Sequence, residues 1–306
     1  MGIVVFGATF VDVKGYPDAQ YIPSGRNVGR VVQVHGGVAR NVAEDIANLE
    51  LRPTLVTVLD HSGISTDVLN KLQDHKVNTQ YIRRTDDGLG TWLAIFDNNG
   101  DVIASISKRP DISVIEDILD EHGDEIISAA DSIVVEIDME VPTLKKIFTL
   151  AEKYHKSIYA VVSNMSIAME RRDLIKRTSC LVCNNQEAGL LFSEEYDEID
   201  PEKMDVILYS KIVSAQIPRM VVTMGDLGAV YAEQGGKHGI IQPQKVEVID
   251  TTGAGDSFFA GVAVGLTYGK DLRESCIIGT RLASAVIGTK ESVCPRFLPE
   301  EFGLSL

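Results

Sequence analysis

The residue types best suited to chemistry lie together at residues 250–257, which read Asp-Thr-Thr-Gly-Ala-Gly-Asp-Ser. They stand between a predicted strand, Val246–Ile249, and an apolar segment that we expect to be helical from Ser257 to about Tyr268. Glycines before a helix leave backbone N–H groups open, and the helix dipole favours an anion there. Such a site can hold a phosphate group during transfer, while Asp256 accepts a proton from a hydroxyl. The spacing alone equally fits a glycine-rich turn in which Asp256 only caps the helix.

These residues need a scaffold, and the rest of the chain reads as alternating strands and helices. Short apolar runs rich in Val and Ile predict buried parallel strands at Ile3–Phe6, Thr54–Leu59, Ser132–Ile137, Ile158–Val162, Cys180–Cys183 and Met220–Thr223. Longer amphipathic segments predict helices at Val38–Leu49, Thr66–His75, Pro142–Tyr154 and Pro201–Gln216. This alternation predicts an α/β fold with a doubly wound, mainly parallel sheet flanked by helices.

Two segments, at about residues 13–34 and 90–107, interrupt the alternation. The first is rich in glycine and proline and ends in the strand-like run Arg30–Val34, while the second reads as a hairpin with its turn at residues 97–100. We expect both to form one small β-sheet that lies over an edge of the main domain as a lid, within a single domain of residues 1–306. Because a sheet this small needs cover, its outer face predicts a homodimer through the lid.

Other motifs occur in order along nearly the whole chain. They are Gly7 to Asp12, Gly36-Gly37-Val38-Ala39-Arg40-Asn41, Asn184-Asn185-Gln186-Glu187 and Thr223-Met224-Gly225-Asp226-Leu227-Gly228. Together with residues 250–257, they resemble the signatures of the PfkB/ribokinase-type carbohydrate and nucleoside kinases. Within that family, Asp12-Val13-Lys14-Gly15-Tyr16 and Asn27-Val28-Gly29-Arg30 are most similar to segments of pseudouridine kinases.

The resemblance implies a ribokinase-like, three-layer doubly wound fold with a small β-sheet lid, and an ATP-dependent kinase. Its acceptor would be a primary hydroxyl, in first place the 5′-hydroxyl of pseudouridine or a related nucleoside. The resemblance makes Asp256 the catalytic base and places the anion hole for the γ-phosphoryl group at Gly253, Ala254 and Gly255. The residues that it implies for substrate binding are Asp12, Asn27, Gly36, Gly37 and Asn41.

The resemblance also implies the nucleotide and ion sites. The residues that would contact the nucleotide are Asn184, Thr223, Gly225 and Gly228. Asn184 and Glu187 would act on Mg²⁺ bound with ATP through water molecules, because Mg²⁺ loses its waters reluctantly. Asp250 and Thr252, with carbonyl groups of residues 286–294, would hold a monovalent cation such as K⁺.

Three features depart from the family pattern and keep other functions open. Ser163 follows the central strand where relatives often have an aspartate, and Gly279 stands where they have Asn or His near the adenine. Lys108 and Arg109 make the end of the lid basic, which favours a phosphorylated acceptor. The alternatives are a ribokinase-like sugar or sugar-phosphate kinase and, in another class, a non-catalytic sensor or scaffold that binds nucleotide or sugar.

Composition limits the partners of the protein. The 306 residues include 29 Lys and Arg against 44 Asp and Glu, and this formal net charge of −15 disfavours nucleic acids and anionic membranes as partners. The apolar stretch Phe258–Leu266 is too short to cross a bilayer. We find no targeting segment, and we expect a cytoplasmic protein with a small-molecule substrate.

Two pairs of small side chains predict packing rather than chemistry. Cys180 and Cys183 are three residues apart on a predicted strand, so their side chains face opposite sides and fit the core better than a metal site. Gly261 and Gly265 are four residues apart on a predicted helix, which favours a close approach of another helix.

Overall fold

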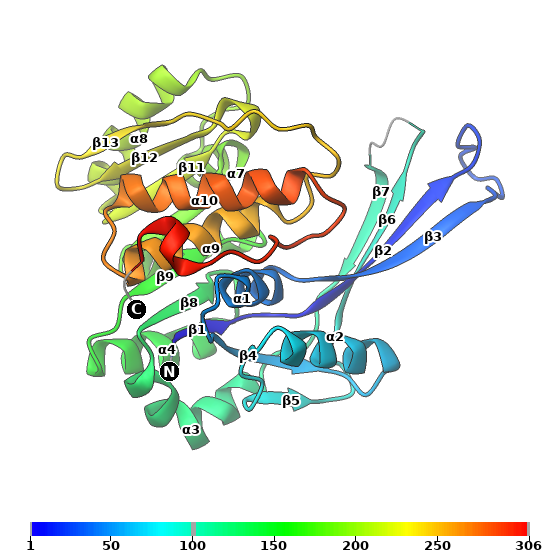
Figure 1. Cartoon of the computed structure of the whole chain (residues 1–306), viewed down its shortest axis with the longest axis horizontal. Helices are drawn as coiled ribbons and strands as arrows, with labels where there is room; N and C mark the ends of the chain where they lie inside the picture. The colour runs from blue at the N-terminus through cyan, green and yellow to red at the C-terminus, as the bar shows by residue number, and fades with distance from the viewer. Residues whose placement is uncertain (1, 99–101, 305–306) are drawn as a thin grey trace.

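A large sheet forms the centre of the computed structural model, which describes residues 2–98 and 102–304 (Figure 1). In these residues its strand order is β13-β12-β11-β10-β9-β8-β1-β4-β5. All neighbours from β11 to β5 are parallel, and β12 and β13 extend one edge in antiparallel fashion. The strands are β1 Ile3–Phe6, β4 Thr54–Leu59, β5 Ile82–Arg84, β8 Ser132–Glu136, β9 Ile158–Val161, β10 Cys180–Asn184, β11 Arg219–Thr223, β12 Ala229–Glu233 and β13 His238–Ile241.

Helices cover both faces of this sheet, so that the predicted doubly wound, three-layer architecture is confirmed (Figure 1). Because side chains alternate along a strand, Val4 and Phe6 of β1 face one core cluster, and Ile3 and Val5 face the other. In the described part of the chain, no helix is long and apolar enough to cross a membrane. The helices are α1 Val38–Asn48, α2 Gly63–Asp74, α3 Ile115–Ala129, α4 Val141–Lys153, α5 Met165–Ala168, η1 Met169–Arg171, α6 Arg172–Ile175, α7 Asn185–Phe192, α8 Pro201–Ala215, η2 Gly225–Leu227, α9 Ala254–Thr267, α10 Leu272–Ile287 and η3 Pro299–Phe302.

A second sheet, which we call the lid sheet, extends away from the main body in the order β3-β2-β6-β7 (Figure 1). Its strands are β2 Phe10–Pro17, β3 Gly29–Gly36, β6 Gly90–Phe96 and β7 Val102–Lys108. Strand β2 joins the two interrupting segments, because it pairs with β3 in antiparallel and with β6 in parallel fashion. The expected small sheet is therefore confirmed, while Asn99 and Gly100 of the predicted turn lie outside the described residues.

The predicted strand at Val246–Ile249 is wrong. Residues 242–250 contain no strand, and Val248 and Ile249 are 65% and 54% exposed. The Ile249 N–H donates to the Ile287 carbonyl at 2.9 Å, so this segment runs past the end of α10 instead of along another strand. An apolar pattern predicts strand character, but a strand also needs a neighbour with unpaired backbone groups, which the local sequence does not reveal.

The order in which the strands are added reverses beside β1. The chain builds outward from β1 to β4 and β5 on one side and from β8 to β11 on the other. Doubly wound sheets bind ligands outside the carboxyl ends of their strands at such a reversal. The lid sheet begins close to this reversal, because β2 starts at Phe10, shortly after the end of β1.

The two pairs of small side chains pack as predicted. Cys180 lies in one core cluster and Cys183 in the other, on opposite faces of the sheet. Gly261 and Gly265 of α9 both lie against α10, where a Cβ would find no room. Gly279 is the α10 residue that meets Gly261, so its missing side chain is explained by close helix packing.

Candidate active site

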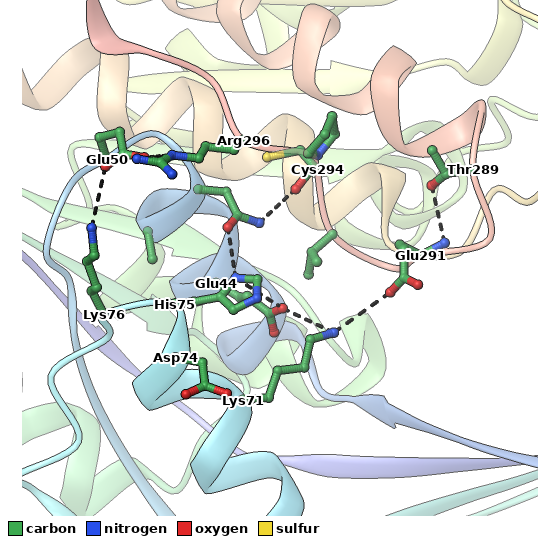
Figure 2. A pocket seen from close by; sticks show the side chains of 14 residues that line it. Glu44, Glu50, Lys71, Asp74, His75, Lys76, Thr289, Glu291, Cys294 and Arg296 are labelled. Carbon is green, nitrogen blue, oxygen red and sulfur yellow. Dashed lines mark hydrogen bonds and ion pairs between the residues drawn. The ribbon is translucent and has the colours of Figure 1, made fainter.

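A cavity of about 530 Å³ lies between α1, α2 and residues 289–296 (Figure 2). None of the predicted catalytic, substrate-binding or nucleotide-binding residues lines it, although Thr289, Glu291, Val293 and Cys294 belong to the segment 286–294 whose carbonyls we expect to hold a cation. Several of its charged groups pair with one another, as Lys76 does with Glu50 (3.9 Å) and Lys71 with Glu291 (3.7 Å). Many of the predicted site residues lie instead at or near the starts of α1, α7 and α9, and others lie in the lid sheet and at the end of β11.

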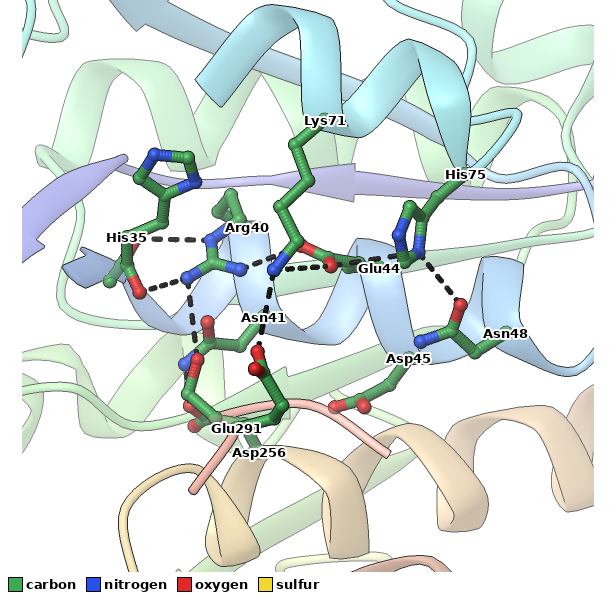
Figure 3. Close-up of polar contacts among 12 residues, drawn as sticks. His35, Arg40, Asn41, Glu44, Asp45, Asn48, Lys71, His75, Asp256 and Glu291 are labelled. Atoms are coloured by element: carbon green, nitrogen blue, oxygen red, sulfur yellow. Dashed lines mark hydrogen bonds and ion pairs between the residues drawn. The ribbon is translucent and has the colours of Figure 1, made fainter. Parts of the chain in front are cut away.

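Asp256 and Asn41 come from distant parts of the chain and meet in one hydrogen bond (Figure 3). Asp256 lies in the first turn of α9, and Asn41 lies near the start of α1. Asn41 Nδ2 donates to Asp256 Oδ2 at 2.6 Å. Asn41 Oδ1 is buried and has no hydrogen-bond partner among the described residues, so one acceptor of this side chain is unused.

Burial raises the pKa of Asp256 to about 6. The Asn41 hydrogen bond and the Arg40 charge oppose this rise, and the carboxylates of Asp12 and Glu187 add to it. Asp256 is therefore within electrostatic reach of both the lid sheet, which carries Asp12, and the start of α7, which carries Glu187. A carboxyl with a pKa near the working pH meets the requirement for a general base.

The turn before Asp256 presents open backbone amides. Gly253, the N-cap of α9, has a left-handed backbone with φ of 82° and no side-chain cap. Among the residues that the structure describes, the N–H groups of Gly253, Gly255 and Asp256 have no acceptor. With the positive end of the α9 dipole they form a site for an anion. Ala254 differs from the expectation, because its N–H already donates to the Thr251 carbonyl at 3.2 Å.

Residues 292–294 and α1 hold this turn in place. A Cβ on Gly253 would overlap the Ser292 carbonyl oxygen, so only glycine fits there. Asp45 of α1 accepts hydrogen bonds from the Ser257 hydroxyl at 2.8 Å and from the Cys294 N–H at 2.6 Å. Asp45 thereby joins α1, α9 and the segment that supports Gly253.

The structure explains why both residues of the double glycine, Gly36 and Gly37, are glycines. A Cβ on Gly36 would meet Asp12 Oδ1 at 2.5 Å, so its absence leaves room for that carboxylate. Gly37 is the N-cap of α1 with φ of 95°, a conformation that favours glycine. Burial raises the pKa of Asp12, against the charges of Lys14 and Arg40. The two glycines therefore set the start of α1 directly beside Asp12.

Sequence reasoning missed a buried acid that supports the start of α1. Glu136, the last residue of β8, accepts a hydrogen bond from the Ala39 N–H at 2.8 Å. Burial, together with the nearby Asp138 carboxylate, raises the pKa of Glu136 to about 8. The signal in the sequence was an acidic residue inside the otherwise apolar run Ser132–Ile137.

Arg40 of the double-glycine motif is structural, being only 1% exposed. It donates to the carbonyls of residues 35 and 36 and pairs with Glu44 Oε2 at 2.7 Å (Figure 3). Lys71 and His75 contact the other oxygen of Glu44 at 3.2 and 3.5 Å. Burial alone raises the pKa of Glu44, but the charges of Arg40 and Lys71 bring it below its usual value. This ionised network fixes α1 against α2.

Asn27, which we expect to contact substrate, lies apart from the other expected substrate residues. Asn27 lies in the loop between β2 and β3, at the end of the lid sheet that is far from the main body (Figure 1). Its side chain accepts a hydrogen bond from the Ile22 N–H at 2.8 Å and donates to the Ile22 carbonyl at 3.0 Å. Asn27 therefore closes its own loop and is not brought to Asp256.

The expected nucleotide residues meet at the carboxyl ends of β10 and β11. Asn184 and Thr223 are register partners on these neighbouring strands. Gly225 and Gly228 flank the turn after β11, and both have positive φ, of 59° and 93°. A Cβ on Gly225 would meet only open space. Two motifs that are separate in the sequence thus lie side by side at the carboxyl ends of neighbouring strands.

Asn184 and Glu187 also have a structural role, because they form the capping box of α7. The side chain of each accepts a hydrogen bond from the backbone N–H of the other, both at 2.8 Å. Burial raises the pKa of Glu187. The capping box uses one oxygen of each side chain, which leaves the second oxygen of Glu187 for a hydrated cation.

Asp250 and Thr252 lie next to the lid sheet. The Thr252 N–H donates to Asp250 Oδ1 at 2.8 Å. Thr252 Oγ1 accepts a hydrogen bond from Lys14 Nζ of β2 at 3.2 Å. Lys14, for which no role was predicted, thereby connects the lid sheet to the turn that carries the open amides.

The basic residues at the end of the lid sheet are paired. Arg109 Nη1 contacts the buried Asp138 Oδ2 at 3.0 Å, and Lys108 pairs with Asp87. Ser163 donates to the same Asp138 through its N–H (3.0 Å) and its hydroxyl (2.7 Å). A cavity of about 140 Å³ opens here, at the carboxyl ends of β1 and β8, lined by Ala8, Arg109, Pro110, Asp111, Ile112, Met139 and Glu140.

Comparison with known proteins relates this arrangement to an enzyme family. The sequence pattern of the pfkB family carbohydrate kinases matches residues 2–295. A guanosine-inosine kinase of Exiguobacterium acetylicum is 30% identical over 292 residues, which cover 95% of each protein. A pseudouridine kinase of Escherichia coli is 25% identical over 279 residues, which cover 89% of this chain and 86% of the relative.

The fold has a solved counterpart as well. Arabidopsis thaliana ribokinase, solved in complex with ribose and ATP, matches this structure with a TM-score of 0.84 at 19% sequence identity. The match covers 99% of both chains. At this identity the likeness establishes the fold alone.

Proposed function

The chain belongs to the pfkB family of carbohydrate kinases, and we propose that this phosphotransferase uses ATP to phosphorylate the 5′-hydroxyl of a ribonucleoside. The observation that carries the proposal is the position of Asp256 beside the open amides of Gly253 and Gly255 at one helix end. The carboxylate suits the removal of a hydroxyl proton, and the amides suit a phosphoryl group that gains charge.

In the proposed reaction, Asp256 takes the proton of the acceptor hydroxyl as its oxygen attacks the γ-phosphorus in line. An oxygen–phosphorus bond forms, the bond between the γ-phosphorus and the bridging oxygen breaks, and ADP leaves with that electron pair. The open amides of Gly253, Gly255 and Asp256 donate to the non-bridging oxygens. Asn41 orients the carboxylate through its 2.6 Å hydrogen bond.

The nucleotide side fits a metal ion that arrives with ATP. No group of three or more His, Cys, Asp or Glu side chains in the described residues could hold a metal by itself. Asn184 and Glu187 lie where they can contact such an ion through water, which suits the reluctance of Mg²⁺ to dehydrate. When bound with ATP, Mg²⁺ neutralises charge on the phosphates. Thr223, Gly225 and Gly228 line the nucleotide in this proposal.

We place the ribose of the acceptor between Asp12 and Asn41. A carboxylate accepts hydrogen bonds from a diol, and the buried Asn41 Oδ1 lacks a partner among the described residues. The 140 Å³ cavity, which Ala8 lines, is close by, because Ala8 O lies next to Gly37 of the double glycine. Closure of the lid sheet over the bound nucleoside would exclude water, which otherwise competes as acceptor.

The relatives indicate which nucleobase the acceptor nucleoside carries. The motifs favour pseudouridine, and the E. coli pseudouridine kinase supports it at 25% identity. The 30% identity to a guanosine-inosine kinase adds guanosine and inosine as acceptors. All three nucleosides present the same ribose 5′-hydroxyl to Asp256. The phosphorylated-acceptor alternative loses its motivation, because Lys108 and Arg109 are already paired with carboxylates.

We also keep a monovalent cation in the proposal, near Asp250 and Thr252. The Thr252 N–H occupies only one oxygen of Asp250, so the other is left for a cation together with backbone carbonyls of residues 286–294. Replacement of K⁺ by Na⁺ in the assay should lower kcat, and an equal rate in both salts would argue against this site.

An acceptor screen tests the proposed function. ADP release would be measured with guanosine, inosine, pseudouridine, free ribose and fructose 6-phosphate, and Asp256→Asn protein from the same preparation would reveal contaminating kinases. We expect turnover with at least one nucleoside and little with the other acceptors. A sugar or sugar phosphate as the best acceptor would contradict the proposal. Tight nucleoside binding without turnover would favour a sensor or scaffold instead.

A further inference from the structure

One lysine of the lid sheet is buried. Lys14 lies in the middle of β2 and is only 6% exposed. It shares a face of the sheet with Asp12, two residues before it, because side chains alternate along a strand. Its neighbours across the sheet are Val32 of β3 and Ala94 of β6, both apolar. A long cationic side chain is therefore held on the same face as the proposed ribose ligand.

In the part of the chain that the structure describes, the ammonium group of Lys14 forms no ion pair. It donates a hydrogen bond to a neutral group, Thr252 Oγ1, at 3.2 Å. Within the described residues, no Asp or Glu oxygen lies within 4.0 Å of Lys14 Nζ, whereas Lys108 of the same sheet is exposed and paired with Asp87. Burial raises the pKa of Asp12 on the same face and the charge of Lys14 lowers it, but the two form no direct ion pair among the described residues. A buried cation that lacks a direct ion pair is stabilised when an anion joins it. The environment of Lys14 therefore favours the binding of an anionic ligand.

The open amides supply the rest of such a site. Thr252, the partner of Lys14, directly precedes Gly253, and the N–H groups of Gly253, Gly255 and Asp256 have no acceptor in the described chain. The lid sheet thus brings a positive charge to the helix end that already favours an anion. Two independent features, a cation and an amide nest from opposite ends of the sequence, converge on one place.

We propose that Lys14 binds the phosphoryl group that is being transferred, by donating a hydrogen bond to a non-bridging γ-phosphate oxygen. This inference rests on the proposed kinase function and adds a catalytic residue to it. Lys14 stabilises the charge that spreads over the γ-phosphoryl oxygens during transfer. Because Lys14 belongs to β2, the site is complete only when the lid sheet is in place, which links nucleoside binding to phosphoryl transfer.

The variants Lys14→Gln, Lys14→Met and Lys14→Arg separate this role from a mechanical one. Gln can still donate a hydrogen bond to Thr252 but carries no charge, Met removes both, and Arg keeps the charge. Lys203→Met, on the exposed side of α8, loses the same charge far from the lid sheet and serves as the control. Thermal melting would show that each protein is folded, and removal of a buried, unpaired charge should not lower the melting temperature.

Calorimetric titration with inorganic phosphate alone measures the anion site whether or not a nucleoside substrate has been found. We expect phosphate to bind the wild-type, Lys203→Met and Lys14→Arg proteins, and its affinity to fall about tenfold or more in Lys14→Gln and Lys14→Met. In the kinase assay the same two variants should lose kcat by at least about tenfold while the KM for the nucleoside changes less. Wild-type phosphate affinity and kcat in Lys14→Gln, or a wild-type protein that does not bind phosphate, would overturn the proposal. Loss of phosphate binding in Lys14→Gln by a protein that phosphorylates no nucleoside would refute the proposed substrate and leave the anion site standing.

Discussion

The pKa of Asp256 gives the proposed base a signature in the pH dependence of the reaction. Burial raises this pKa to about 6, and below that pH the carboxyl already holds the proton that it should accept. We therefore expect kcat/KM for the nucleoside to fall about tenfold per pH unit on the acid side of this value and to level off above it. Initial rates across a pH series measure the profile, and a profile that stays flat through pH 6 would contradict the role of Asp256.

The same profile tests the contact with Asn41. Asn41 donates a hydrogen bond to the charged form of Asp256 and so lowers its pKa. In Asn41→Ala the fall of kcat/KM on the acid side of the pH profile should therefore begin at higher pH. Any loss of nucleoside affinity would lower kcat/KM at every pH as well. Asn48→Ala is the matched control on the same helix: it loses a 2.7 Å hydrogen bond to the Cys294 carbonyl and should lower stability without moving the limb.

Residue types within a motif could be predicted from the sequence, but their contacts could not. The motif at residues 250–257 correctly predicted a helix start beside Asp256, because capping and glycine patterns are local, although α9 begins at Ala254 and not at Ser257. The bond between Ala254 and Thr251, the closure of the Asn27 loop and the pairing of Arg109 depend on backbone paths and partners that no motif records. Lys14 and Thr252 are 238 residues apart in the sequence, and only the fold brings them together.

Among the elements, the turn into α9 carries the open amides of the proposed anion site. Its two glycines, Gly253 and Gly255, allow a matched test of that site. Gly253 has φ of 82° and contacts the Ser292 carbonyl, so Gly253→Ala should cost about 2 kcal/mol or more of stability and abolish activity. A Cβ on Gly255 meets nothing, so Gly255→Ala should change stability by less than about 0.5 kcal/mol.

Gly255→Ala should still reduce kcat, because its methyl group would enter the space that we assign to the transferred phosphoryl group. Urea unfolding and steady-state kinetics on both variants measure these effects. Full activity in a stable Gly255→Ala protein would mean that the phosphoryl group lies away from this turn.

The alternation of apolar runs predicted the parallel strands well, and it failed where pairing depends on distant neighbours. The bounds of β1 and β4 agree with the prediction, because buried parallel strands read as continuous apolar runs. The antiparallel strands β12 and β13 at one side of the sheet were missed, and residues 246–249 were predicted as a strand although they pair with no strand in residues 2–98 and 102–304. The local pattern predicts which segments can form strands, while the fold determines which of them pair with a neighbouring strand.

At the scale of the whole molecule, the outer face of the lid sheet predicts self-association. Leu93 of β6 and Ile106 of β7 are register partners on one face and are 40% and 70% exposed, and Val31 of β3 is 71% exposed. Exposed apolar side chains that gather on one sheet face are typical of an interaction surface. We expect a homodimer through this face, as the sequence predicted.

Light scattering on size-exclusion fractions would measure the mass of wild-type protein and of Ile106→Lys. The variant should shift the protein towards the 33.4 kDa monomer. Val206→Lys, which replaces a 67% exposed valine on α8, is the matched control and should leave the mass unchanged. A wild-type protein that is monomeric at all concentrations, or an Ile106→Lys protein that keeps the dimer mass, would refute the interface.

The role of Asp256 as general base is tested most directly by the turnover of Asp256→Asn with ATP and the best nucleoside acceptor. Calorimetry would measure the binding of both ligands to the same variant. On folding, the pKa of Asp256 rises from 3.8 to about 6, so its ionisation opposes folding as pH rises through this window, and the amide should not destabilise the protein at neutral pH. We predict that both ligands bind and that kcat falls by about 10²–10⁴-fold, the contribution of a general base. A folded Asp256→Asn protein that turns over within a few-fold of the wild type would contradict the claim that this carboxylate passes the phosphoryl group to an alcohol.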